Sequence, residues 1–69
     1  MGYQSTYQPR GYETVHTITG PTEKDVRDGI QSILDRYHPM GYGTKVTSEP
    51  REKEDGSWTA EVTRDSSAG

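Results

Sequence analysis

The clearest pattern of hydrophobic and polar positions lies in residues 22–38, TEKDVRDGIQSILDRYH. Its apolar residues follow one another at spacings of four, three, one and three, which places them on a single face of an α-helix. They are Val26, Ile30, Ile33, Leu34 and Tyr37. The segment therefore predicts one amphipathic helix against which the rest of a small core must pack.

Both ends of this helix are indicated by local signals. Thr22 is a favourable N-cap, and Asp25 occupies the return position of a capping box, where Glu is commoner. Pro39 disfavours a helical conformation at the residue before it, so the helix is predicted to end near residue 38. Opposite charges four residues apart stabilise the exposed face in two pairs, Glu23 with Arg27 and Lys24 with Asp28.

Gly29 is the discordant position in the helix, because an internal glycine costs about 1 kcal/mol relative to alanine. Two interpretations are open. Gly29 is either a tolerated surface glycine or a point where another backbone, such as that of a second copy, approaches closely.

Three short segments have β character. Residues 12–19, YETVHTIT, are β-branched and end at Gly20-Pro21. Residues 44–49 follow a turn rich in Gly and Pro, and residues 57–64, SWTAEVTR, alternate strictly as a half-buried strand does. Val15 and Ile18 fall on opposite faces of a regular strand, which requires either a bulge or partial cover on both faces.

The predicted fold class is α+β, with the order β-α-β-β. One helix packs on a three-stranded antiparallel sheet that has the last strand in its centre. Residues 12–65 form this single domain, residues 50–56 are its charged hairpin loop, residues 66–69 are a tail, and residues 1–11 are a disordered arm. The order of elements is similar to that of dodecins, a similarity of topology alone because no motif of that family is present.

Composition leaves little material for a core. Only 26% of the 69 residues are hydrophobic and 28% are charged, which is near the boundary between globular and disordered chains. Cysteine is absent, so no disulfide compensates for a small core, and self-association is the expected aid. The expected core combines the five helix residues with Val15, Ile18, Val46, Trp58, Ala60 and Val62.

Charge and hydropathy narrow the classes of partner. The net charge of −3 is opposite to the clustered basic surface of a dedicated nucleic-acid binder. No apolar run reaches the length of a membrane span, so no membrane contact is expected and the cytosol is the expected compartment.

Threonines give the first candidate surface. Five of them are predicted to share the sheet face opposite the helix: Thr17, Thr19, Thr47, Thr59 and Thr63. Threonine favours strands, so this is either an ordinary solvated face or an interface with another sheet or a protein partner.

The turn GYGTK at residues 41–45 gives the second candidate. It lacks the spacing of a Walker motif and precedes a strand, whereas a dinucleotide fingerprint follows one. Glycines can nevertheless present backbone N–H groups to an anion, and a hairpin would bring this turn near the end of the last strand. The candidate ligand-binding residues are His38, Gly41, Tyr42, Gly43, Thr44, Lys45, Arg64 and Ser66. The simpler interpretation is a tight turn with solvated charges around it.

Catalytic signals are weak. Asp35 and His38 stand one turn apart, but only Ser66 or Ser67 offers a nominal nucleophile. His16 and His38 are too isolated in sequence to indicate a metal site. We therefore expect no enzyme, no cofactor and no metal.

The leading hypothesis is a small non-enzymatic binding module that acts through protein–protein interaction as a homo-oligomer. By loose analogy, phage and mobile elements encode short polar chains of this kind as inhibitors or accessory proteins. The alternative is a binder of a small anionic ligand, such as a nucleotide, at residues 41–45 and Arg64. A third hypothesis places RNA on Arg10 and the tyrosines of the arm.

Overall fold

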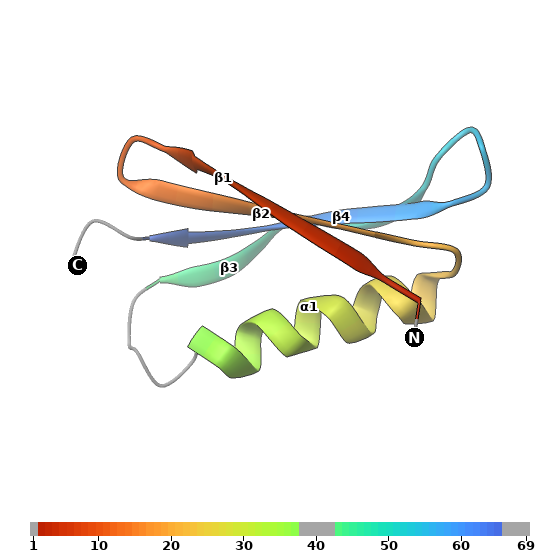
Figure 1. The fold of residues 1–69 in the computed structure, drawn as a ribbon, viewed down its shortest axis with the longest axis horizontal. Coiled ribbons are helices and arrows are strands. Elements are labelled where there is room, and N and C mark those ends of the chain that lie inside the picture. Colours follow the sequence, from red (N-terminus) through yellow and green to blue (C-terminus); the bar gives the residue numbers. More distant parts are fainter. Residues whose placement is uncertain (1, 38–42, 66–69) are drawn as a thin grey trace.

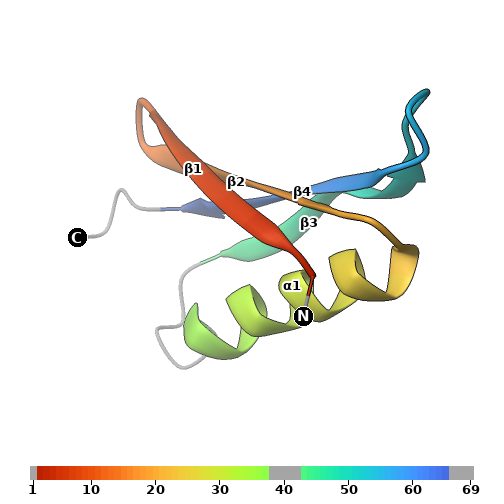
Figure 2. The same ribbon diagram turned by 45° about the vertical axis from the view of Figure 1, so that its right-hand side comes forward.

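The computed structural model describes residues 2–37 and 43–65. Its elements are β1 (Gln4–Arg10), β2 (Glu13–Gly20), α1 (Glu23–Tyr37), β3 (Thr44–Glu52) and β4 (Trp58–Asp65). The strands form one antiparallel sheet in the order β1-β2-β4-β3, and α1 runs along one side of it (Figures 1 and 2). We call the side of the sheet against α1 the inner face and the opposite side the outer face.

The α+β class is confirmed, as is the placing of β4 between β2 and β3, antiparallel to both. The predicted order β-α-β-β and the predicted number of strands were wrong, because the order is β-β-α-β-β and the sheet has four strands. The predicted disordered arm was also wrong over Gln4–Arg10, which forms β1 and pairs with β2 along its whole length. Every residue of β1 is exposed, so no hydrophobic period marks it in the sequence.

The helix forms for the reasons that its sequence indicates. The backbone N–H of Asp25 donates to the Thr22 hydroxyl oxygen at 3.2 Å, and that hydroxyl donates to the Asp25 carboxylate at 2.9 Å. The capping interaction thus joins the two side chains instead of returning to the backbone of Thr22. Both predicted ion pairs are present, Arg27 to Glu23 at 2.7 Å and Lys24 to Asp28 at 3.1 Å.

The core lies between α1 and the inner face. Its buried members are Ile18, Val26, Ile30, Ile33, Ala60 and Val62, and Leu34, Tyr37, Val46 and Trp58 pack against them. Val15 is absent from this core, which corrects the expected set. The pairing of β2 is unbroken on both sides, so there is no bulge in β2 and Val15 lies half-buried on the outer face.

Gly29 fits neither of its two interpretations. It is buried, and an added Cβ atom would lie 2.6 Å from Cγ2 of Ile18 and 2.9 Å from Cδ1 of Tyr3. Side chains of the same chain therefore occupy the space that a larger residue would need. The glycine lets the start of the N-terminal hairpin and the middle of β2 approach α1 closely.

The connection between β3 and β4 is shorter than predicted, because β3 extends to Glu52 and includes Pro50 and Arg51. The remaining turn is held by the N–H of Lys53, which donates to the Ser57 carbonyl at 2.7 Å. Gly56 has a φ of 90°, which a residue with a side chain rarely adopts. Among residues 2–37 and 43–65, no helix is long and apolar enough to cross a membrane.

Candidate functional site

The outer face is where the structure places the predicted threonines. Ile18 and Ala60 are paired and buried beneath α1, and side chains alternate along each strand. The neighbours of this pair therefore point outward, including Thr17, Thr19 and Thr59. Thr63 lies on the same face because it is opposite Val15, and Thr47 joins it through a hydrogen bond.

Hydrogen bonds connect side chains of the outer face where β3 pairs with β4. The hydroxyl oxygens of Thr47 and Thr63 are 2.9 Å apart, and Thr47 also donates to the Glu61 carbonyl at 3.4 Å. Thr63 is only 8% exposed although α1 packs on the other face of the sheet. Its neighbours shield it, so part of the outer face already resembles a packed surface.

Charges on the outer face are mixed in sign. The register places Arg10 and Lys45 there among the basic residues, and Glu13, Glu61 and Asp65 among the acidic ones. A hollow of about 200 Å³ lies on this face between β1, β2 and β4. Its lining includes Thr6, Gln8, Arg10, Val15, Thr17 and Glu61. Polar, apolar and charged groups of both signs thus meet in a small area.

A row of rings crosses the inner face toward the C-terminal end of α1. The ring of His16 lies 6.1 Å from that of Tyr7 and 5.6 Å from that of Tyr37, and the Arg64 guanidinium lies 4.1 Å from the centre of the Tyr37 ring. Within the described ranges, Nε2 of His16 and Nε of Arg64 are buried without a hydrogen-bond partner. Sequence reasoning assigned His16 no role, because its neighbours come from three other elements.

The surroundings of His16 in this row disfavour its protonated form. Burial is the main cause that lowers the pKa of His16 below its ordinary value of 6.5, and the charges of Arg64 and Arg36 lower that pKa further. A protonated imidazole would carry its positive charge in a buried position, near the charges of Arg64 and Arg36. The imidazole ring is tilted by 47° to the Tyr7 ring and by 42° to the Tyr37 ring.

The predicted anion site is only partly assembled. Thr44 is paired with Arg64, and the N–H of Asp65 donates to the Gly43 carbonyl at 2.9 Å, so the start of β3 does lie beside the end of β4. Lys45 is paired with Thr63 and lies on the outer face, whereas Arg64 lies on the inner face against Tyr37. These two cations therefore cannot both face one anion bound on either face.

Four residues of that predicted site fall outside the described ranges: His38, Gly41, Tyr42 and Ser66. The nominal catalytic positions His38, Ser66 and Ser67 fall outside them as well. Among the residues that the structure does describe, no three His, Cys, Asp or Glu side chains are grouped so that they could hold a metal ion.

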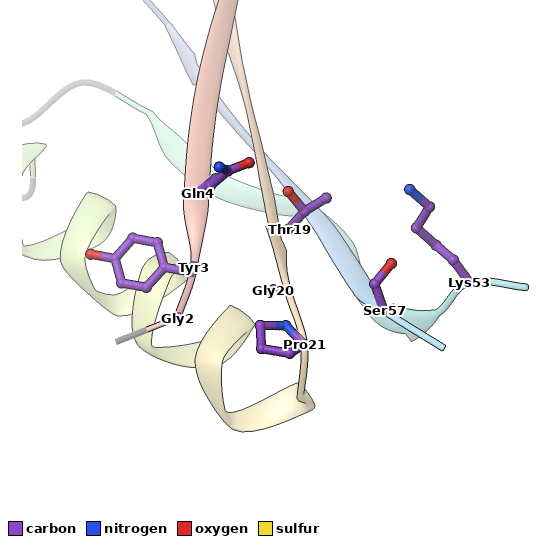
Figure 3. A pocket seen from close by; sticks show the side chains of 8 residues that line it. All are labelled: Gly2, Tyr3, Gln4, Thr19, Gly20, Pro21, Lys53 and Ser57. Carbon is purple, nitrogen blue, oxygen red and sulfur yellow. The ribbon is translucent and has the colours of Figure 1, made fainter. Parts of the chain in front are cut away.

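A wider hollow of about 600 Å³ opens where the start of β1, the end of β2 and the β3–β4 turn meet. Figure 3 shows the side chains that line it: those of Tyr3, Gln4, Thr19, Pro21, Lys53 and Ser57, beside Gly2 and Gly20. Tyr3 lies over α1, and Lys53 lies on the opposite side of the hollow (Figure 3). Because these side chains do not converge on a point, the hollow indicates no particular ligand.

Compared with models of protein families, with curated proteins and with solved structures, the chain matches none.

Proposed function

We propose that this chain is a non-enzymatic binding module that acts through protein–protein interaction as a homo-oligomer, with the outer face as its contact surface. One observation carries the proposal. No described element covers the outer face, yet on β2 and β4 it includes half-buried β-branched side chains and the buried Thr63. Such a face offers ordered and nearly neutral area to another protein.

The charge pattern favours a protein over a nucleic acid as the partner. A nucleic-acid surface gathers Lys and Arg on one side, because phosphate contacts supply most of the affinity. Here Arg10 and Lys45 are interspersed with Glu13, Glu61 and Asp65 on the same face. A partner with both acidic and basic groups would complement this pattern.

The test places one arginine in the middle of the outer face. Thr17→Arg introduces a long charged side chain beside Glu61, where a partner would have to pack. Gln31→Arg adds the same charge on the exposed side of α1 and is the matched control. We expect Thr17→Arg to abolish the retention of proteins captured from cell extract by the immobilised wild type, and Gln31→Arg to leave it intact.

Two measurements make the outcome decisive. Circular dichroism must show that both variants are folded, and light scattering over a concentration series must give the mass of the wild type. A chain that stays monomeric at high concentration and is indifferent to substitutions on the outer face would contradict the proposal.

The second candidate function is the binding of a small anion near Arg64. It is favoured by the buried Nε of Arg64, which has no hydrogen-bond partner in the described part of the chain, and by the glycine-led start of β3 beside it. A thermal-shift series with inorganic phosphate and nucleotides tests it. Saturable stabilisation that disappears in Arg64→Ala would support this function, and no shift with any anion would exclude it.

A further inference from the structure

The two edges of the sheet differ in how well they resist further pairing. β3 has register shifts between Val46 and Ser48 and between Ser48 and Arg51, and it also contains Pro50. It carries four charged residues: Lys45, Glu49, Arg51 and Glu52. Bulges, prolines and charges are the features that protect natural edge strands from pairing with another chain.

β1 has little such protection. Its pairing with β2 is regular throughout, and residues 4–8, QSTYQ, are all uncharged. Pro9 and Arg10 protect only its last two positions. The strand is exposed along its whole length, and Tyr3 and Tyr7 are exposed aromatic side chains beside or within it. An open edge and exposed aromatic groups therefore occur together.

The turn between β1 and β2 determines which backbone groups point outward. Arg10 pairs with Glu13 across two residues, and Gly11 has a φ of 61°, as the first position of a type II′ turn does. The pair that closes such a turn is hydrogen-bonded, and bonded pairs alternate along an antiparallel ladder. Ser5, Tyr7 and Pro9 therefore direct their backbone groups away from β2.

Pro9 supports this assignment. A proline has no N–H to donate, so within a sheet it is tolerated where the missing donor would face solvent. Pro9 occupies an outward position, and β1 remains paired on both sides of it. The free edge thus offers the N–H and C=O groups of Ser5 and Tyr7.

We propose that β1 pairs antiparallel with β1 of a second copy of this chain, around a twofold axis at Thr6. Ser5 of each copy then lies opposite Tyr7 of the other, and their outward groups form four backbone hydrogen bonds within the bounds of β1. Moving the axis to Tyr7 would place Ser5 opposite Pro9, which cannot donate. No charged residue of one strand lies opposite a like charge in the other.

The side chains are compatible with this register. Thr6 meets Thr6, and Gln4 meets Gln8, so each opposed pair can form hydrogen bonds. Tyr7, which is 71% exposed, lies diagonal to the tyrosines of the other copy and loses exposure on the inner face. The two outer faces become one continuous eight-stranded surface, so the inference rests on the proposed function and supplies its oligomeric form.

The first test is amide hydrogen exchange on the full chain at low and high protein concentration. We expect the amides of Ser5 and Tyr7 to gain protection as concentration rises. Thr6 and Gln8, whose amides face β2, are internal controls and are protected at both concentrations. Light scattering is expected to show a mass approaching twice 7.7 kDa over the same range.

The second test is Ser5→Pro, which removes one outward N–H from each copy and leaves the bonds to β2 intact. We expect this variant to raise the dissociation constant of the dimer by roughly tenfold or more. Its circular dichroism at low concentration should match that of the wild type. A dimer that persists unchanged in Ser5→Pro, or a wild type that stays monomeric, overturns the proposal.

The outcomes separate this inference from the proposed function. If Thr17→Arg abolishes partner capture while the wild type is monomeric, the outer face is the contact surface and the β1 pairing is wrong. If Ser5→Pro dissociates a dimer and Thr17→Arg has no effect on capture, the pairing stands and the outer face is not the contact surface. Protection of Ser5 and Tyr7 only by an added extended peptide also overturns pairing with a second copy.

Discussion

His16 is held between two tyrosine rings on the inner face, and two guanidinium groups lie near enough to affect its charge. Gly29 is a second residue whose role depends on its neighbours, because Ile18 and Tyr3 fill the space beside it. In both cases the role of the residue is set by its contacts with elements that are distant in the sequence. Each contact gives a measurable expectation.

The pH dependence of stability follows from His16. Its folded-state pKa is lowered, so the native state binds fewer protons than the unfolded state between that pKa and the ordinary 6.5. The stabilisation is complete above about 6.5 and is lost as the pH falls from there through the folded-state pKa. The urea midpoint of the wild type should therefore fall as the pH is lowered through that window.

His16→Phe is the control for this pH dependence. The substitution keeps an aromatic ring between Tyr7 and Tyr37 but cannot titrate, so its urea midpoint should change less over the same window. An NMR titration of the imidazole of His16 gives the pKa directly. A value at or above 6.5 would contradict the expectation.

Gly29→Ala should destabilise the fold although alanine is the better helix former. Overpacking against Ile18 costs about 1 to 3 kcal/mol, whereas the gain in helix propensity is about 1 kcal/mol. We expect a net loss of up to about 2 kcal/mol in the free energy of unfolding, measured by urea titration. Gln31→Ala, on the exposed side of the same helix, should be nearly neutral, and an equal effect of the two substitutions would show that Gly29 is not under steric restriction.

Among the elements, α1 and β1 differ most in how clearly the sequence marks them. The helix has a hydrophobic period, an N-cap and ion pairs, and all three are present, although the return interaction of the cap joins the side chains of Thr22 and Asp25. β1 has none of these, because an exposed edge strand buries no regular row of side chains. Its signals were weaker: Gly11 followed by Tyr12 for a turn, and tyrosines at positions 3 and 7 on one side of a strand.

The N-cap gives a prediction for the helix. Thr22→Ala removes the acceptor of the Asp25 N–H and should cost about 1 kcal/mol of stability. Thr22→Ser keeps the hydroxyl and should retain most of that stability. Thermal unfolding of the two variants measures the difference, and identical melting temperatures would mean that the cap contributes nothing.

In the whole molecule, the N-terminal strand completes the sheet and covers part of the inner face. Tyr3 lies against Gly29, and Tyr7 lies near His16. The hairpin of β1 and β2 thus belongs to the folded unit, in contrast to the predicted arm. A small core makes such contacts important, because a short chain has few others.

Removal of residues 1–10 should therefore lower the urea midpoint. Replacing them with a Gly-Ser segment of equal length should lower it by a similar amount, since chain length is then unchanged. Ser5→Pro measured at low concentration is the reference, because it keeps β1 while weakening any pairing between copies. If the deletion and the Gly-Ser replacement both kept the urea midpoint of the wild type, β1 would not stabilise the domain.

The candidate surfaces were predictable to different extents. The shared face of the five threonines follows from alternation along the strands, and the register places them together. Their role as an interface stays a prediction. The separation of Lys45 from Arg64 was not foreseen, although the same alternation places neighbouring positions of β3 on opposite faces.

The sequence by itself determined the helix, most of the core and the central place of β4, because hydrophobic periodicity and turn residues act locally. Only the tertiary structure determined where β1 pairs and which neighbours surround Gly29, His16 and Val15. The surroundings of each of these are formed by residues that are distant in the sequence and lie opposite or above it. No local pattern in the sequence records those contacts. The open edge of β1 is such a consequence, since an edge exists only once the order of the strands is set.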